Sequence, residues 1–284
     1  MTPETTAGFS RNDGTTSQNE GDDMRIYLCT DMEGISGISY PDEFMTDGPR
    51  YEYGRTLLTG DVAAAVEGLK AGGATKIVVL DGHGGGNNFI FDKLPAGAEY
   101  ICGRGGSPRA LPFLDESYDA VGMIGQHAMA GTPDATWPHT QSSASWLGMW
   151  VNGREIGEIG QFAITAGGYG LPLILFTGDR AACAEVRELV GDQVETVAVK
   201  HAASATRAKC LALDDARHAI YDAAKHSLGR IATAQPLRVD MPMEVKIRFN
   251  ATKFADDREK NGADRVDLLT VRRITNDPYG VYAV

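Results

Sequence analysis

Carboxylate and imidazole side chains follow three short apolar runs of this sequence. Asp31 and Glu33 follow the first run, His83 follows the second and His127 follows the third. Each run is rich in β-branched and aliphatic residues and stops at a polar turn, which predicts a buried strand. The carboxyl ends of parallel strands meet at one edge of an open sheet, and ligands bind there. We therefore expect these four side chains to lie close together.

These residue types favour a metal site over a nucleophile triad. Two imidazoles with carboxylates form the mixed nitrogen and oxygen set that suits zinc, with cobalt or manganese as alternatives. A pair of metal ions needs a carboxylate that both ions share, and we predict that Asp31, at the end of the first run, is this bridge. Glu158 stands among small residues at the start of a predicted helix and is the predicted fifth ligand.

Motifs of several other catalytic classes are absent from the sequence or incomplete in it. Neither the phosphate-binding G-x-x-x-x-G-K-[ST] loop nor H-E-x-x-H occurs, and the glycine-rich segment 82–86 is followed by Asn87 where a dinucleotide fingerprint has its last glycine. Ser142, Ser143 and Ser145 lie near His139 in the sequence, but no G-x-S-x-G elbow accompanies them. A serine hydrolase and a nucleotide-binding enzyme are therefore disfavoured.

The elements that must position these residues alternate along the chain. Strands are expected at 24–30, 76–80, 120–125, 145–150 and 172–176, and helices at about 51–71, 157–166 and 180–190. This alternation predicts an α/β fold whose mostly parallel central sheet is covered by helices.

The predicted pattern changes near residue 190. A strand at 196–199, a helix at about 213–228 and a strand at 243–249 indicate a smaller C-terminal α/β domain. We accordingly predict a disordered tail over 1–23, a metal-binding α/β domain over 24–190 and the smaller domain over 191–284.

The overall composition excludes several kinds of partner. The formal net charge is −11 and no Lys/Arg-rich run occurs, so neither nucleic acid nor an anionic membrane is expected as a partner. No apolar run approaches the roughly 18–20 residues that a membrane helix needs, and no signal peptide is recognisable. The four scattered cysteines are expected to be reduced thiols. The expected location is therefore the cytoplasm.

Short motifs follow one another in a fixed order over residues 24–209. D-M-E-G-I-S-G begins at Asp31, D-G-H ends at His83 and G-Q-H-A contains His127, and these are followed by His139 and by G-E-I-G around Glu158. This ordered set resembles the D-aminopeptidases, the M55 class of metallopeptidases. The first 23 residues and residues 256–284 do not match the family pattern closely.

The resemblance implies a site, an activity and an assembly. It implies two zinc ions held by Asp31, Glu33, His83, His127 and Glu158. His139 is the matching position for a catalytic histidine. The implied activity is release of N-terminal D-amino acids from short peptides such as D-Ala-D-Ala, and the implied assembly is a ring-type homo-oligomer, a decamer of stacked five-membered rings.

Three other functions remain compatible with these residues. The nearest one keeps the metals and changes the substrate to another small amide or an L-peptide. A two-metal phosphoesterase would need a basic residue near the metals, for which Arg104 and Arg109 are the candidates. A non-catalytic peptide-binding protein would bind peptides equally well without metal.

Overall fold

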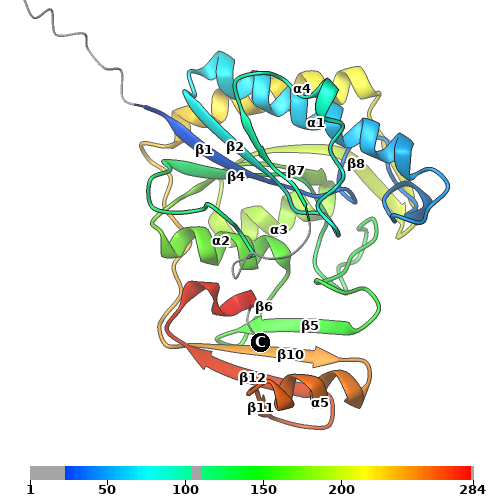
Figure 1. The fold of residues 1–284 in the computed structure, drawn as a ribbon, viewed down its shortest axis with the longest axis vertical. Coiled ribbons are helices and arrows are strands. Elements are labelled where there is room, and N and C mark those ends of the chain that lie inside the picture. The colour runs from blue at the N-terminus through cyan, green and yellow to red at the C-terminus, as the bar shows by residue number, and fades with distance from the viewer. Residues whose placement is uncertain (1–22, 104–109, 283–284) are drawn as a thin grey trace, which may run out of the picture.

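Two β-sheets organise the chain in the computed structural model, which describes residues 23–103 and 110–282 (Figure 1). The large sheet has seven strands in the order β3-β2-β1-β4-β7-β8-β9. These strands are β1 (Arg25–Thr30), β2 (Lys76–Asp81), β3 (Glu99–Ile101), β4 (Ala120–Gln126), β7 (Leu173–Asp179), β8 (Glu195–Ser204) and β9 (Arg207–Cys210). All neighbouring pairs are parallel except β8 and β9. The predicted mostly parallel α/β sheet is therefore confirmed.

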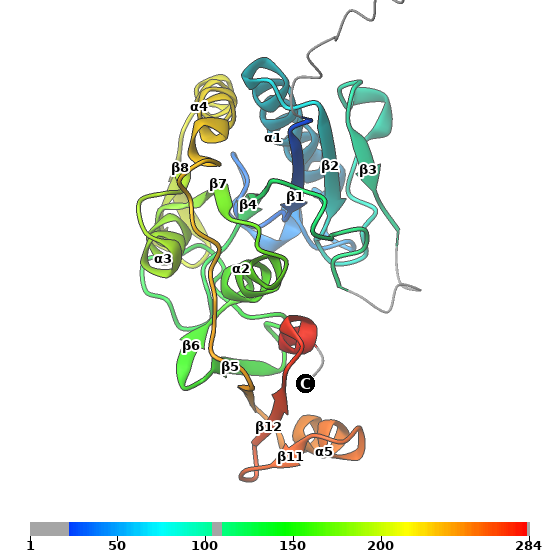
Figure 2. The ribbon, with the colours of Figure 1, turned by 90° about the vertical axis from the view of Figure 1, so that its left-hand side faces the viewer.

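Helices cover both faces of the large sheet (Figure 2). Helices α1 (Tyr51–Gly72) and α4 (Leu213–Ser227) pack on one face, and α2 (Glu158–Gly168) and α3 (Arg180–Val190) pack on the other. All seven residues of β4 are buried, as expected for a central strand with both faces covered. Among the described helices, none is both long and apolar enough to cross a bilayer.

The small sheet has five antiparallel strands in the order β11-β12-β10-β5-β6. Its strands are β5 (Trp146–Val151), β6 (Arg154–Ile156), β10 (Met243–Phe249), β11 (Asp264–Arg265) and β12 (Thr270–Thr275). Residues on β10 alternate between buried and more exposed, because one face packs on a core that includes α5 (Thr252–Lys260). Asn152 and Gly153, between β5 and β6, both have positive φ, at 48° and 82°, as a two-residue hairpin turn of the Asn-Gly kind requires.

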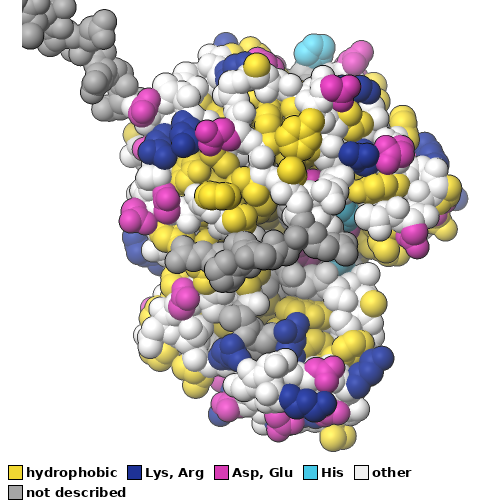
Figure 3. Space-filling view, in the orientation of Figure 1, with side chains coloured by type: hydrophobic (Ala, Val, Ile, Leu, Met, Phe, Trp, Pro, Cys, Tyr) yellow, Lys and Arg dark blue, Asp and Glu magenta, His cyan; other side chains and the backbone are white. Residues whose placement is uncertain are grey.

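Short 3-10 turns complete the described elements. They are η1 (Pro41–Glu43), η2 (Phe91–Lys93), η3 (Leu228–Arg230) and η4 (Pro278–Tyr282). The last of them, η4, packs against α2 and so brings the end of the chain back to the large sheet. On the face shown in Figure 3, acidic and basic side chains are interspersed, and neither kind forms a large patch.

The sheets divide the chain differently from the predicted boundary at residue 190. Strands β8 and β9 and helix α4 follow that residue but belong to the large sheet and its cover, whereas β5 and β6 precede it and belong to the small sheet. The reason is that α3 is the crossover that returns the chain to the large sheet beside β7, and such a pairing is not visible in local sequence patterns. Nearly all of the predicted tail, residues 1–22, lies outside the described residues.

Candidate metal centre

Three neighbouring strands of the large sheet end at one cavity. Strand β1 lies between β2 and β4, so the residues that follow these strands meet, as the sequence predicted. The cavity has a volume of about 440 Å³. All five predicted ligands and the predicted catalytic histidine line it, namely Asp31, Glu33, His83, His127, Glu158 and His139.

Asp31 lies between two imidazoles. Its Oδ1 is 2.9 Å from Nδ1 of His83, and its Oδ2 is 3.4 Å from Nε2 of His127. The backbone N–H of Met32 donates to Oδ1, and Nε2 of Gln126 donates to Oδ2, so both oxygens are held in place. One carboxylate thus faces two separate groups of ligand atoms, which is the geometry of a bridge.

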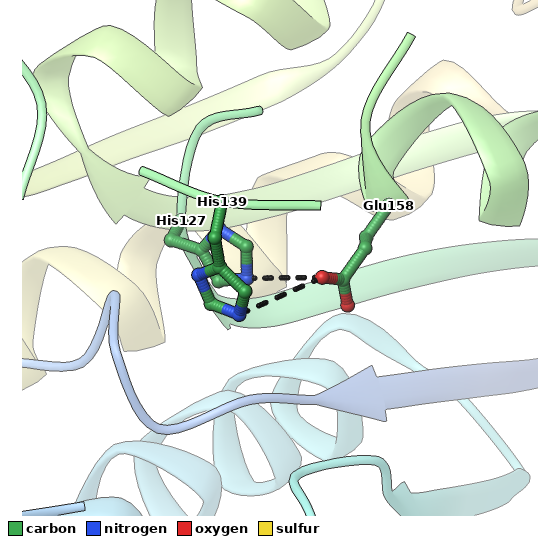
Figure 4. Close-up of side chains that lie close together, drawn as sticks. All are labelled: His127, His139 and Glu158. Atoms are coloured by element: carbon green, nitrogen blue, oxygen red, sulfur yellow. Dashed lines mark ion pairs between the residues drawn. The ribbon is translucent and has the colours of Figure 1, made fainter. Parts of the chain in front are cut away.

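The candidate ligand atoms form two clusters, and Asp31 belongs to the first and lies next to the second. Asp31, Glu33 and His83 form one cluster, and His127, His139 and Glu158 form the other; within each, one ligand atom per residue lies within 4.8 Å of the rest. In the second cluster, Oε1 of Glu158 is 3.4 Å from Nε2 of His127 and 3.8 Å from Nε2 of His139 (Figure 4).

Each imidazole of the site is oriented by a backbone carbonyl. His83 contacts the carbonyl of Phe44 through Nε2, His127 contacts that of Ala128 through Nδ1, and His139 contacts that of Trp137 through Nδ1. These distances are 2.9, 2.9 and 3.0 Å. A carbonyl oxygen only accepts, so in the neutral imidazole this nitrogen carries the proton. The other nitrogen then presents its lone pair to the carboxylates, as metal-ligating histidines do.

Glu33 provides an independent test of whether the residues of the site fit a cation. Its Oε2 is buried and has no hydrogen-bond partner among the described residues, although Nδ1 of His83 is 3.0 Å away in a geometry that forms no hydrogen bond. A buried carboxylate oxygen without a partner is costly. A cation between Glu33 and His83 would satisfy it, so the residues present fit a metal.

The ligand side chains shift one another's pKa values. Burial by itself lowers the pKa of His127, but the charge of Glu158 and its hydrogen bond raise that pKa to about 10. Burial likewise opposes ionisation of Asp31, yet the hydrogen bond from His83 and the charge of His127 hold the pKa of Asp31 below its ordinary value. A proton and a metal ion compete for the same nitrogen of His127, so metal binding at this site would depend on pH.

His139 lies on a strained loop that is fixed at several points. Trp137 and Gln141 have positive φ values of 47° and 58°, which residues other than glycine rarely adopt. The N–H of Trp137 donates to the carbonyl of Ala205 and that of Gln141 donates to Oε1 of Glu158. The ring of His139 stacks on that of His127, with centroids 3.8 Å apart. These contacts place Nε2 of His139 between the carboxylates of Glu33 and Glu158.

Gln161, which the sequence did not single out, connects this loop to the end of the chain. It lies one turn after Glu158 on α2 and is fully buried. Its Nε2 donates to the carbonyl of Val281 at 3.0 Å, and its Oε1 accepts from Nε2 of Gln141 at 3.0 Å. The sequence signal that could have indicated Gln161 is an amide side chain one helical turn after Glu158, among small and apolar residues.

Asp81, the last residue of β2, has the chemistry to orient a ligand imidazole but does not do so. Its carboxylate instead accepts from the backbone N–H and the side-chain amide of Asn88, at 2.6 and 2.7 Å. The same amide also donates to the carbonyl of His83. Asp81 therefore shapes the glycine-rich loop around His83, while the backbone carbonyl of Phe44 orients the ring.

The described part of the chain gives no support to a serine hydrolase or to a phosphoesterase. Ser142 and Ser143 line the cavity, but the hydroxyl of Ser145 donates to Oγ of Ser142, so this pair is not aligned on a histidine base. The described residues that line the cavity include no Lys or Arg. Arg104 and Arg109, the candidate phosphate-binding residues, lie outside the described residues.

Comparisons with known proteins give a matching family model, a relative and a similar solved structure. The family model, described as D-aminopeptidase, Peptidase_M55, matches residues 24–284, so the match extends beyond residue 209 and includes residues 256–284. A D-aminopeptidase of Bacillus subtilis (strain 168) is 34% identical over 192 residues, covering 66% of this chain and 68% of the relative. Among solved structures, the "Zn-dependent D-aminopeptidase DppA from Bacillus subtilis, a self-compartmentalizing protease" is similar with a TM-score of 0.87 and 27% identity. That match covers 92% of this chain and 94% of the other.

Proposed function

The chain belongs to peptidase family M55, the D-aminopeptidases, and we propose that it is a two-zinc aminopeptidase acting on short peptides with an N-terminal D-amino acid. The observation that carries this proposal is the position of Asp31, whose two oxygens face the imidazoles of His83 and His127. A single shared carboxylate between two clusters of ligand atoms is what a two-metal site requires.

The two clusters divide the ligands between two ions. Glu33 and His83 would hold one ion and His127 and Glu158 the other, with Asp31 shared. When bound, such a pair of ions polarises a carbonyl group and makes a water molecule a strong nucleophile at neutral pH. Cobalt and manganese suit the same nitrogen and oxygen donors.

His139 is the proposed acid of the reaction. Its Nδ1 is engaged by the carbonyl of Trp137, so Nε2 is the nitrogen that faces the cavity. With the imidazole doubly protonated, this nitrogen can stabilise the oxyanion of the attacked amide or give a proton to the leaving nitrogen. Nε2 of His139 is also 3.8 Å from Oε1 of Glu158, so the alternative role of His139 is that of a further metal ligand. A variant of His139 that keeps both ions but loses activity would support the role of acid over that of ligand.

The substrate class rests on the relatives together with the cavity. Both similar proteins from Bacillus subtilis are named as D-aminopeptidases, which supports D-peptides over the L-peptides or other small amides that the same metals could cleave. The cavity, with a volume of about 440 Å³, has the size of a site for a small ligand such as a short peptide. The printed title of the similar structure describes a self-compartmentalizing protease, which supports a ring-type homo-oligomer. We also propose a cytoplasmic location.

The deciding experiment measures metal content and stereoselective turnover on the same preparation. Protein purified without chelator is analysed for zinc, and cleavage of D-Ala-D-Ala is compared with that of L-Ala-L-Ala. About two zinc ions per chain with D-selective cleavage is the expected result. Cleavage of the L-peptide alone would refute the D-peptide as the substrate and favour an L-peptide. Protein that neither contains nor regains metal would refute the metal site.

A further inference from the structure

Lys200 is a buried cation directly behind the metal-binding loop. It lies on β8, only 2% exposed, and its ammonium group donates to three backbone carbonyls, those of Glu33, Ile35 and Ile38. The distances to Ile35 and Ile38 are 3.1 and 2.7 Å. Among the described residues it makes no ion pair with a carboxylate within 4.0 Å. All three donors of the ammonium are therefore used to hold one short loop.

Burial of this charge is costly, so the contacts it makes must be specific. Burial lowers the pKa of Lys200 to about 8, while the charges of Asp179, Glu33 and Asp61 and the thiol of Cys210 oppose that effect. Asp179 and Asp61 are themselves fully buried and balance the ammonium at longer range. A neutral side chain of the same length would avoid this cost but could not donate to the three carbonyls.

The loop after β1 needs such a donor because its backbone turns sharply. The N–H of Gly34 donates to the carbonyl of Gly125, and a Cβ at Gly34 would lie 2.1 Å from the carbonyl oxygen of Gln126. This close approach directs the carbonyls at 33, 35 and 38 toward β8. With the carbonyl of Glu33 held by Lys200, its carboxylate points the other way, toward His83.

Lys200 belongs to the antiparallel hairpin of β8 and β9, and this hairpin also contacts the loop that carries His139. The carbonyl of Ala205, in the turn between these strands, accepts from the N–H of Trp137, two residues before His139. The hairpin therefore contacts both the loop that carries Glu33 and the loop that carries His139. Neither β8 nor β9 contributes a ligand to the site itself.

We propose that Lys200 is a positioning residue for the metal cluster of Asp31, Glu33 and His83, acting as a fixed internal cation that sets the conformation of residues 33–38. This inference rests on the proposed two-metal function. It predicts an unequal effect on the two ions, since Lys200 contacts the loop of Glu33 and makes no contact with His127 or Glu158.

The test is zinc titration of the metal-free protein by calorimetry, comparing wild type with Lys200→Met. We expect the variant to bind its first zinc ion with unchanged affinity and its second at least tenfold more weakly. We also expect kcat to fall by a larger factor than KM changes. Lys200→Arg keeps a cation with several donors and should bind both ions. Folded Lys200→Met that binds two ions with wild-type affinities would overturn the proposal.

A matched control separates positioning from general loosening of the loop. Ser36 lies in the same loop and donates through its N–H and hydroxyl to Asp61. Ser36→Ala should lower the melting temperature yet leave both zinc affinities unchanged, whereas an equal loss of the second ion in this variant would contradict a specific role for Lys200. If Lys200→Met does not fold, Lys200→Gln decides, because a folded Gln variant that binds both ions with wild-type affinities overturns the proposal and one that weakens only the second ion supports it.

The outcome is distinguishable from failure of the proposed function. Wild-type protein that binds two zinc ions but cleaves no D-peptide would refute the substrate and leave the comparison of zinc affinities intact. Wild-type and Lys200→Met proteins with the same two affinities, in an enzyme that cleaves D-peptides, would refute only the role of Lys200.

Discussion

Glu185 should make the stability of the metal-free protein depend on pH. It lies on α3 behind the second ligand cluster, where its Oε2 accepts from the N–H of Met129 at 2.8 Å. Its Oε1 is buried without a partner among the described residues, close to Gly157, where an added Cβ would come within 3.1 Å of it. Burial is the main cause that raises the pKa of Glu185 from 4.5 to about 7, against the hydrogen bond from Met129.

The sign and size of the effect follow from this pKa. A carboxyl whose pKa is raised in the folded state contributes stability that is fully present below the unfolded pKa and is lost as pH rises toward the folded pKa. Between pH 5 and pH 8 the loss from Glu185 amounts to about 2–3 kcal/mol, since each pH unit of difference corresponds to about 1.4 kcal/mol. Glu185→Gln has nearly the same shape, still accepts from Met129 and does not titrate.

The assay is urea unfolding of wild type and Glu185→Gln at pH 5 and pH 8, in the presence of a chelator because a nearby cation would alter the pKa. We expect the variant to gain about 2–3 kcal/mol relative to wild type on going from pH 5 to pH 8. Glu188→Gln is the control, because that side chain on the same helix is 82% exposed, and its difference from wild type should not change with pH. A pH-independent difference for Glu185→Gln would show that Glu185 is already ionised and refute the reasoning.

Three further predictions concern the metal centre and its support. Asp31→Asn should lower the zinc content at both positions and reduce kcat by at least about 100-fold, as measured by elemental analysis and turnover; retention of two ions would exclude a bridging role. Glu33→Ala and His83→Ala should each abolish hydrolysis while circular dichroism stays unchanged, and wild-type rates at matched metal loading would exclude both residues from the site. Gln161→Leu removes the link to Val281 and should cost about 1–3 kcal/mol in unfolding experiments, since the buried carbonyl of Val281 is left unpaired. It should also lower kcat by a larger factor than it changes KM; unchanged stability and kcat would show that the link is dispensable.

Much of the candidate site was predictable because its ligands follow strands that the sequence marks clearly. Asp31, His83 and His127 come directly after or within two residues of three apolar runs that are now β1, β2 and β4. Parallel strands place such residues at one edge whatever the order of the chain. Glu158 was predictable from its place at the first position of α2, with small residues on both sides.

The supporting residues could not be predicted in the same way. Phe44, Ala128 and Trp137 orient the imidazoles through backbone carbonyls, and a backbone group leaves no trace in residue type. Asp81, which has the right chemistry and position to orient an imidazole, instead binds Asn88. The choice between these two arrangements depends on loop conformation.

The sequence by itself determined the class of fold, the candidate ligands that converge and the chemistry that they favour, because hydrophobic runs and the residues after them are local properties of the chain. Only the tertiary structure decided how the sheets divide the chain, since β5 pairs with β10, far along the chain, and β8 joins β7 after the crossover through α3. The same long-range pairing carries Lys200 to the loop of Glu33, 167 residues away. Contacts of that range form only when the whole chain is packed, because they depend on strand order and burial and not on any local pattern.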